Sequence, residues 1–208
     1  MRTCAVLAGS SMQEMLQKAA DAKNLGADFV EVCLDMLNDY NSLELIESFP
    51  LPVILSCGYT KRQETITALK KALRFRTEFV DIDLAFPRNF IEEIFFYARA
   101  NGIKTIASYY PETFPAQKTL KKIIGDMAIL SKHIKIVLPA KSKKDGSFDE
   151  IFALTAKTGA KLTLISSPES ATDKRNFIGY GKIESSSRNR HLPQIEDVKK
   201  SIADRRIG

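Results

Sequence analysis

The sequence has no tryptophan, two histidines and three cysteines, and these shortages exclude several kinds of site. Cys4, Cys33 and Cys57 show no CxxC spacing and lie in or beside apolar runs, which is typical of small buried thiols in a reducing compartment. With only His133 and His191 available as imidazole ligands, a zinc site is not expected.

The sequence also lacks long apolar runs and low-complexity stretches. No apolar run reaches the roughly 18 residues that a membrane span requires, and the beginning, MRTCAVLAGSS, has no long signal-peptide core. Ten glycines, eight prolines and charges of mixed sign argue against disorder. With 208 residues and 44% apolar content, we expect a single domain over residues 1–208, in the cytoplasm and without membrane contact.

Charge of one sign is in moderate excess, with a net charge of +6. The basic residues are scattered, and clusters such as Lys118–Lys122 and Lys141–Lys144 fall on expected helix faces and loops. This pattern does not favour nucleic-acid binding. A basic surface that attracts a small anionic metabolite fits it as well.

Short β-rich apolar runs alternate with amphipathic stretches along the chain. The expected strands are Thr3–Leu7, Phe29–Leu34, Val53–Ser56, Phe79–Asp83, Lys104–Tyr109, Ile134–Leu138, Lys161–Ile165 and Asn176–Tyr180. The expected helices are Met12–Asn24, Ser42–Glu47, Gln63–Arg74, Asn89–Asn101, Ala116–Ser131, Phe148–Lys157 and Ile195–Ile202. Glycines at Gly26, Gly102 and Gly159 mark three helix exits.

Eight such units predict an α/β fold, a compact (β/α)8 TIM barrel. Only Ser166–Arg175 separates the last two strands, so we expect the barrel to be shortened at the seventh βα unit, with a short or absent helix. An open flavodoxin-like sheet is the alternative. The GxGxxG motif that would support it is absent after the first strand.

Polar residues inside the expected strands are candidates for chemistry. Lys135 lies between isoleucines in Ile134–Leu138, and an inward-facing amine of lowered pKa suits Schiff-base formation with a ketone. The alternative is an outward lysine that extends its ammonium to water. Glu31, Cys33 and Asp35 share one face of the expected second strand, so both carboxylates project into the barrel near its mouth, unless Asp35 caps a loop. Glu31 is expected to oppose the lowering of the Lys135 pKa.

Two further strands end in polar residues. On the fourth strand, one of Asp81 and Asp83 is expected inside the barrel and the other in the loop or facing the helices. Tyr109 and Tyr110 end the fifth strand, beside the strand that carries Lys135. A tyrosine hydroxyl there either binds substrate or acts as a weak acid–base group, unless the rings only pack.

These segments resemble the type I 3-dehydroquinate dehydratase family over nearly the whole chain. Six segments match family patterns in order. The second strand, Gly26–Asp35, resembles G-A-D-x-V-E-x-R-x-D, the third, Pro52–Gly58, resembles P-V-I-x-T-C-R, and the fourth, Phe79–Leu84, resembles Y-V-D-V-E-L. Ser108–Pro111 resembles S-Y-H-D, Ile134–Val137 with Ser142–Asp145 resembles V-K-I-A followed by S-x-x-D, and Pro193–Gln194 resembles the P-G-Q of the lid. The resemblance implies dehydration of 3-dehydroquinate to 3-dehydroshikimate through an imine on Lys135. It also implies a homodimer and the need for neither metal nor cofactor.

The chain departs from the family at several binding positions. The family's arginines correspond to Cys33 and to Gly58, although Arg62 lies four residues after the latter. Arg175 loosely matches a serine–arginine element, and Gln194 belongs to the lid. Together with Glu31, the residues Cys33, Arg62, Arg175 and Gln194 are the expected substrate-binding set.

The family's acid–base histidine corresponds to Tyr110, whose unperturbed pKa of about 10 makes it a poor base. His191, three residues before Gln194, has a suitable unperturbed pKa and is favoured as acid–base group if the lid closes over Lys135. Three functions remain open: a dehydratase with a rebuilt site, a diverged Schiff-base lyase or aldolase acting on another small oxo acid, and a non-catalytic relative that binds a metabolite or a partner protein.

Overall fold

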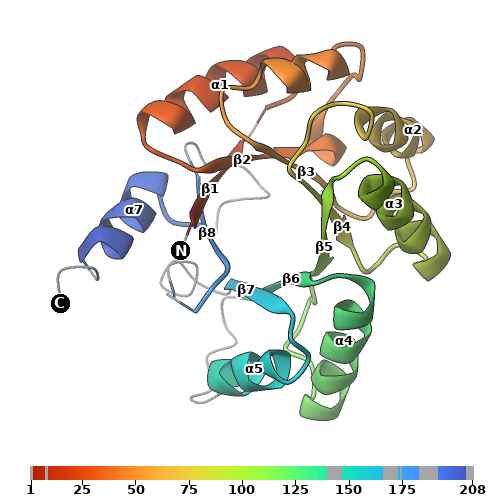
Figure 1. Ribbon diagram of the computed structural model, residues 1–208, viewed down its shortest axis with the longest axis vertical. Helices are drawn as coiled ribbons and strands as arrows, with labels where there is room; N and C mark the ends of the chain where they lie inside the picture. Colours follow the sequence, from red (N-terminus) through yellow and green to blue (C-terminus); the bar gives the residue numbers. More distant parts are fainter. Residues whose placement is uncertain are drawn as a thin grey trace.

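The computed structural model describes residues 2–7, 9–139, 147–165, 173, 175–182 and 192–204. Eight parallel strands form one sheet in the order β7-β6-β5-β4-β3-β2-β1-β8, which confirms the predicted (β/α)8 barrel. Looking down the barrel, the helices surround the ring of strands (Figure 1). The strands are β1 Arg2–Leu7, β2 Phe29–Cys33, β3 Val53–Cys57, β4 Phe79–Asp83, β5 Lys104–Tyr109, β6 His133–Val137, β7 Lys161–Ile165 and β8 Ile178–Lys182.

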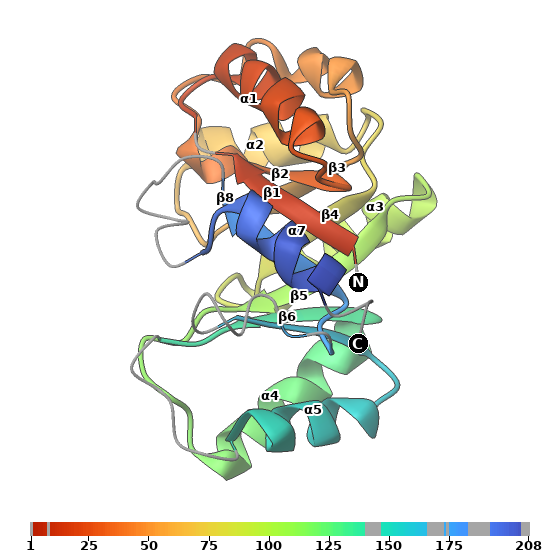
Figure 2. The same cartoon turned by 90° about the vertical axis from the view of Figure 1, so that its left-hand side faces the viewer.

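The helices follow the predicted positions closely. They are α1 Met12–Asn24, α2 Gln63–Ala72, α3 Arg88–Ala100, α4 Gln117–Leu130, α5 Ser147–Ala156 and α7 Ile195–Asp204. The expected glycine exits are confirmed, because Gly26, Gly102 and Gly159 have φ of 79°, 75° and 72°, where a side chain would be strained. Figure 2 shows α7 lying over β1 and β8, which it contacts.

The second crossover was predicted as a helix over Ser42–Glu47 and is instead made of 3₁₀ turns. These are η1 Leu34–Met36 and η2 Leu43–Ser48. Pro50 follows directly on Phe49, the residue that ends η2, and a residue before proline is driven out of helical geometry. The segment is therefore too short for a regular α-helix.

The barrel is nearly closed, and its seam lies between β7 and β8. No continuous ladder joins these two strands among the described residues. Instead, the buried Asn176 side chain takes the place of a strand backbone: its Oδ1 accepts from the Leu164 amide at 2.8 Å and its Nδ2 donates to the Leu164 carbonyl at 3.1 Å. Thr163 Oγ1 also accepts a hydrogen bond from the Ile178 amide. This explains why β8 begins at Ile178, two residues later than predicted.

The seventh crossover is short in the chain, because only residues 166–177 separate β7 from β8. The prediction of a short or absent helix concerns Ser166–Arg175, most of which lies outside the described residues. No helix among the residues that the structure describes is long and apolar enough to cross a membrane.

Candidate active site

One layer inside the barrel carries four polar side chains, one from each even-numbered strand. β2 contributes Glu31, β4 Asp81, β6 Lys135 and β8 Tyr180, and each is at most 3% exposed. Period-2 alternation turns these side chains inward, and in barrels of this kind four alternate strands supply each layer. Because every strand brings its residue to the same height, four positions far apart in the sequence meet at one place.

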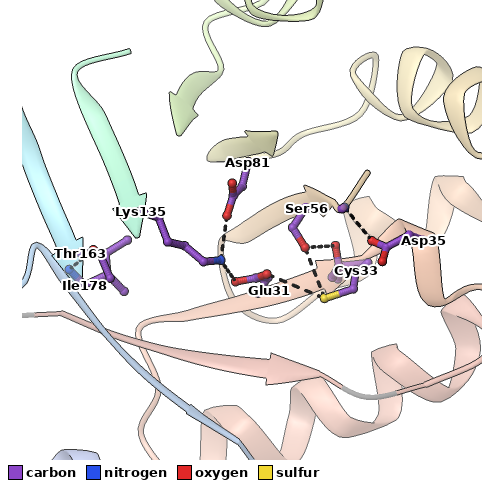
Figure 3. A network of polar contacts seen from close by, with 10 residues as sticks. Glu31, Cys33, Asp35, Ser56, Asp81, Lys135, Thr163 and Ile178 are labelled. Carbon is purple, nitrogen blue, oxygen red and sulfur yellow. Dashed lines mark hydrogen bonds and ion pairs between the residues drawn. The ribbon is translucent and has the colours of Figure 1, made fainter. Parts of the chain in front are cut away.

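Lys135 lies at the centre of this layer and holds both carboxylates (Figure 3). Its Nζ donates to Asp81 Oδ2 at 2.7 Å and to Glu31 Oε2 at 3.0 Å. Lys135 therefore points into the barrel, as predicted from the sequence. The pair on the fourth strand is also resolved as expected, because Asp81 faces the barrel interior and Asp83 accepts from the Ala85 amide in the following turn.

The charge state of Lys135 differs from the sequence-based prediction. Burial alone lowers the pKa of the ammonium, but Asp81 and Glu31 together outweigh burial and raise the pKa well above its usual value. The prediction of a lowered pKa was wrong because it counted one carboxylate where the barrel supplies two. Burial in turn raises the pKa of Asp81, despite the adjacent ammonium, and this favours its acceptance of a proton.

A small cavity of about 20 Å³ opens beside the Lys135 amine. Its described lining residues are Val6, Glu31, Tyr110, Lys135, Val137, Ile165, Tyr180 and Leu192. Space for a single water needs about 10–15 Å³, so the cavity in this conformation holds little more than that. A larger ligand has to displace side chains of the cavity wall.

Two residues, one at the end of β2 and one in the turn that follows it, lie behind the site. Cys33 is fully buried, accepts a hydrogen bond from Ser56 Oγ at 3.3 Å and lies 3.8 Å from Glu31 Oε1, outside the cavity lining. For Asp35, a position in the barrel mouth with Glu31 and a loop cap were both open. The structure shows the second, because the chain leaves the strand conformation at Leu34 and Asp35 lies in η1, where it accepts from the Gly58 amide at 3.0 Å.

The two candidate arginines lie away from the amine. Arg62 precedes α2 in the loop after β3, and its side chain is exposed. Arg175 packs against α5, where its guanidinium pairs with Asp149 and Asp173 and lies 4.1 Å from the centre of the Phe152 ring. Neither arginine lines the described cavity wall. Their roles in binding substrate stay predictions.

Of the remaining candidates, Tyr110 is closest to the amine. It lines the cavity, and its ring centre lies 5.8 Å from Lys135 Nζ. Gln194 is exposed and forms a β-bridge with Lys182, just before α7. Leu192 in the same segment is buried in the cavity wall, whereas His191 lies outside the described residues. The acid–base role proposed for His191 therefore stays a prediction.

Tyr180 is the member of the central layer that the sequence analysis missed. Its ring centre lies 4.6 Å from Lys135 Nζ, and burial raises the pKa of its phenol well above the usual value. The signal was present, because Ile178-x-Tyr180 repeats the phase of Phe29-x-Glu31 and Phe79-x-Asp81. The sequence analysis placed Tyr180 at the end of its strand, whereas β8 continues to Lys182. The inward position of Tyr180 in the central layer was therefore missed.

The fold and the site define a (β/α)8 barrel with a lysine buried at its centre between two carboxylates. The family model for type I 3-dehydroquinase matches residues 3–165. The chain belongs to this family.

Individual relatives agree with the family match. The chain is 30% identical over 105 residues to a chloroplastic bifunctional 3-dehydroquinate dehydratase/shikimate dehydrogenase of Arabidopsis thaliana, covering 44% of this chain and 17% of that protein. It is 29% identical over 130 residues to the 3-dehydroquinate dehydratase of Methanocaldococcus jannaschii, covering 57% of this chain and 58% of that protein. The matched region thus spans less than two thirds of either relative.

The structural comparison shows the shared fold. The 3-dehydroquinate dehydratase of Geobacillus kaustophilus superposes with a TM-score of 0.81 over 99% of this chain and 91% of that one, at 13% identity. Since identity is low, this likeness describes the barrel itself.

Proposed function

We propose that the chain is a dehydratase that converts 3-dehydroquinate to 3-dehydroshikimate through an imine on Lys135. The observation that carries the proposal is the buried Lys135 amine, held by Glu31 and Asp81 beside a cavity in a barrel of this family. Lysine is the barrel residue able to form a covalent bond with a ketone, and the two carboxylates supply a place for its proton.

The reaction begins with loss of a proton from the Lys135 ammonium, for which Asp81 is the suited acceptor because its pKa is raised. Nζ then adds to the ketone carbon, and the ketone oxygen leaves as water to give a protonated imine. Removal of a proton from the neighbouring carbon sends its electron pair toward the imine nitrogen. That pair returns as the hydroxyl on the next carbon leaves as water, and hydrolysis of the imine releases the product and the amine.

Removal of the carbon-bound proton needs a base of suitable pKa. Within this proposal His191 has that role, with Tyr110 as the group that lines the cavity from the end of β5. Arg62, in the loop after β3, is the proposed partner of the substrate carboxylate, since loops after the strands lie at the face where barrel active sites form. A homodimer in the cytoplasm belongs to the same proposal.

A second candidate function is a Schiff-base lyase or aldolase that acts on a smaller oxo acid. The cavity volume of about 20 Å³ favours it, because a six-membered ring with a carboxylate needs several times that space. Cys33 and Gly58 also leave the site without the arginines of the family pattern. Under this function, pyruvate reaches Lys135 with less displacement of the cavity wall than 3-dehydroquinate requires.

Trapping with borohydride distinguishes these functions. The protein is incubated with 3-dehydroquinate or with pyruvate, reduced with borohydride, and analysed by intact mass and by peptide mapping. We expect the 3-dehydroquinate reaction to give an adduct on Lys135 that Lys135→Met abolishes. Lys122→Met is the matched control, because Lys122 is exposed on α4 and pairs only with Asp126 among the described contacts.

The outcomes separate clearly. An adduct with pyruvate but none with 3-dehydroquinate supports the second candidate function. Adducts that survive in Lys135→Met place the reactive amine elsewhere. If neither ketone gives an adduct, the chain is a binding relative without Schiff-base chemistry.

A further inference from the structure

The Tyr180 hydroxyl is the one polar group of the central layer that the proposed reaction has not yet used. Tyr180 lies in the middle of β8, its side chain is 1% exposed, and its ring faces Lys135 Nζ. It lines the same cavity as Lys135 and Glu31. Any group that bonds to Nζ in this cavity therefore lies against Tyr180.

This hydroxyl is also unsatisfied. Among the residues that the structure describes, no atom accepts from or donates to Tyr180 Oη. Buried tyrosine hydroxyls normally have a partner, and leaving one unpaired destabilises the fold. Phenylalanine would fill the same space without that loss. Because Tyr180 lines the cavity beside Lys135, its unpaired hydroxyl is available as a donor to a ligand that enters the cavity.

The protonation state of Tyr180 restricts the role it can have. Burial raises the pKa of its phenol well above the usual value, so the group is protonated at neutral pH and is a donor instead of a base. Tyr110 differs in that it is only partly buried, at the end of β5. The two tyrosines therefore line the same cavity but differ in burial, and Tyr180 is the one shielded from water.

We propose that Tyr180 is a catalytic residue whose hydroxyl donates a proton to the carbonyl oxygen that Lys135 displaces. This assignment rests on the proposed imine chemistry of Lys135 and deepens it, by naming the group that helps the carbonyl oxygen leave. It also predicts that the preferred ligands of the cavity are ketones, whose oxygen accepts the hydrogen bond that Tyr180 lacks.

The protons balance within the central layer. The ammonium holds three protons, and the product imine keeps one of them, so two must reach the oxygen that leaves as water. Asp81 takes a proton from Nζ, and Tyr180 gives its own proton to the carbonyl oxygen as the carbon–nitrogen bond forms. Tyr180 regains a proton from the nitrogen of the adduct, and the Asp81 carboxyl, which lies against that nitrogen, gives its proton to the hydroxyl that leaves as water. The imine nitrogen keeps one proton. No oxidant, metal or outside acid is required.

The test compares the rate of imine formation in the parent protein and in Tyr180→Phe. Protein is mixed rapidly with 3-dehydroquinate, quenched with borohydride at set times, and the adduct on Lys135 is measured by intact mass. We expect Tyr180→Phe to form the adduct about 100-fold more slowly, within the range for loss of an acid–base group. Tyr97→Phe is the matched control, because Tyr97 is 49% exposed on α3, and its rate should equal that of the parent.

Thermal unfolding separates chemistry from structure. Because the hydroxyl is unpaired in the fold, Tyr180→Phe should unfold at the same temperature as the parent or higher, so slower imine formation cannot be attributed to unfolding. A purely structural role moves the unfolding temperature and leaves the rate of imine formation unchanged.

Failure of this assignment is distinct from failure of the proposed function. If the parent forms the Lys135 adduct and Tyr180→Phe forms it equally fast, the assignment to Tyr180 is overturned while the imine chemistry stands. If the parent forms no adduct with 3-dehydroquinate or with pyruvate, both are overturned.

Discussion

Removing the positive charge of Lys135 is expected to destabilise the protein strongly at neutral pH. Lys135→Met keeps most of the side-chain volume but leaves Glu31 and Asp81 facing each other inside the barrel. Both carboxylates contact Nζ, at 3.0 and 2.7 Å, so their nearest oxygens are separated by no more than a few ångströms. At about 5 Å and an effective dielectric of about 20, their repulsion is roughly 3 kcal/mol.

Desolvation adds to this repulsion. Breaking a buried ion pair by removing one partner typically costs about 3–5 kcal/mol, because the remaining charge stays buried. For a chain of 208 residues this corresponds to a fall of roughly 10 °C in the unfolding temperature. The loss is avoidable only if the folded protein binds a proton on one of the carboxylates.

The pH dependence follows from that proton. Without the ammonium, the folded-state pKa of Asp81, which is already raised, rises further above its unfolded value of about 4. Between those two values the folded state binds more protons than the unfolded state, so stability falls as pH rises. In the parent, the raised pKa of Lys135 keeps its contribution present throughout this window, since it is lost only at alkaline pH.

The assay is urea unfolding at pH 5 and pH 7.5. Circular dichroism is the suitable probe, because the chain has no tryptophan for fluorescence. We expect the difference between parent and Lys135→Met to be about 3–5 kcal/mol at pH 7.5 and clearly smaller at pH 5. The double variant Lys135→Met/Asp81→Asn, which removes one charge, should recover most of the loss at pH 7.5. A single variant as stable as the parent at pH 7.5 would refute the reasoning.

Further predictions concern the closure of the barrel and the packing of α7. Asn176→Ala leaves the buried amide and carbonyl of Leu164 unpaired, so urea unfolding should show a loss of about 2–4 kcal/mol. Gly181→Ala places a Cβ at 2.7 Å from the Ile195 backbone and should lower the free energy of unfolding by about 1–3 kcal/mol. In contrast, Gly125→Ala meets nothing within 4 Å on helix α4 and should be stabilising by about 0.5–1 kcal/mol in the same measurement.

Much of the fold was predictable because its signals are local. The spacing of apolar residues placed α1 correctly at both ends, and Gly26, Gly102 and Gly159 marked the turns that need positive φ. The start of β8 was placed two residues early because Asn176 joins the sheet through its side chain. That contact with Leu164 is made across the seam and leaves no periodic pattern in the sequence.

The candidate site was predictable where the alternation of side chains along a single strand determines which of them point into the barrel. Lys135 and Glu31 were both placed inside the barrel by alternation alone. The pKa of Lys135 was predicted in the wrong direction because it depends on a third strand, whose Asp81 comes within 2.7 Å only when the barrel closes. Electrostatics of a layer cannot be read from any single strand that contributes to it.

The contacts within the layer also show why the hydroxyl of Tyr180 indicates a ligand, which the sequence around it does not. In a layer supplied by alternate strands, each polar side chain can be checked for a partner among the other three. An ammonium between two carboxylates has a physical explanation within the fold, because each charge has a partner. The Tyr180 hydroxyl has none among the described residues, while its ring already fills the space that packing requires. Stability alone favours phenylalanine at that position, so the hydroxyl is best explained by a ligand that enters the cavity and reacts at Lys135.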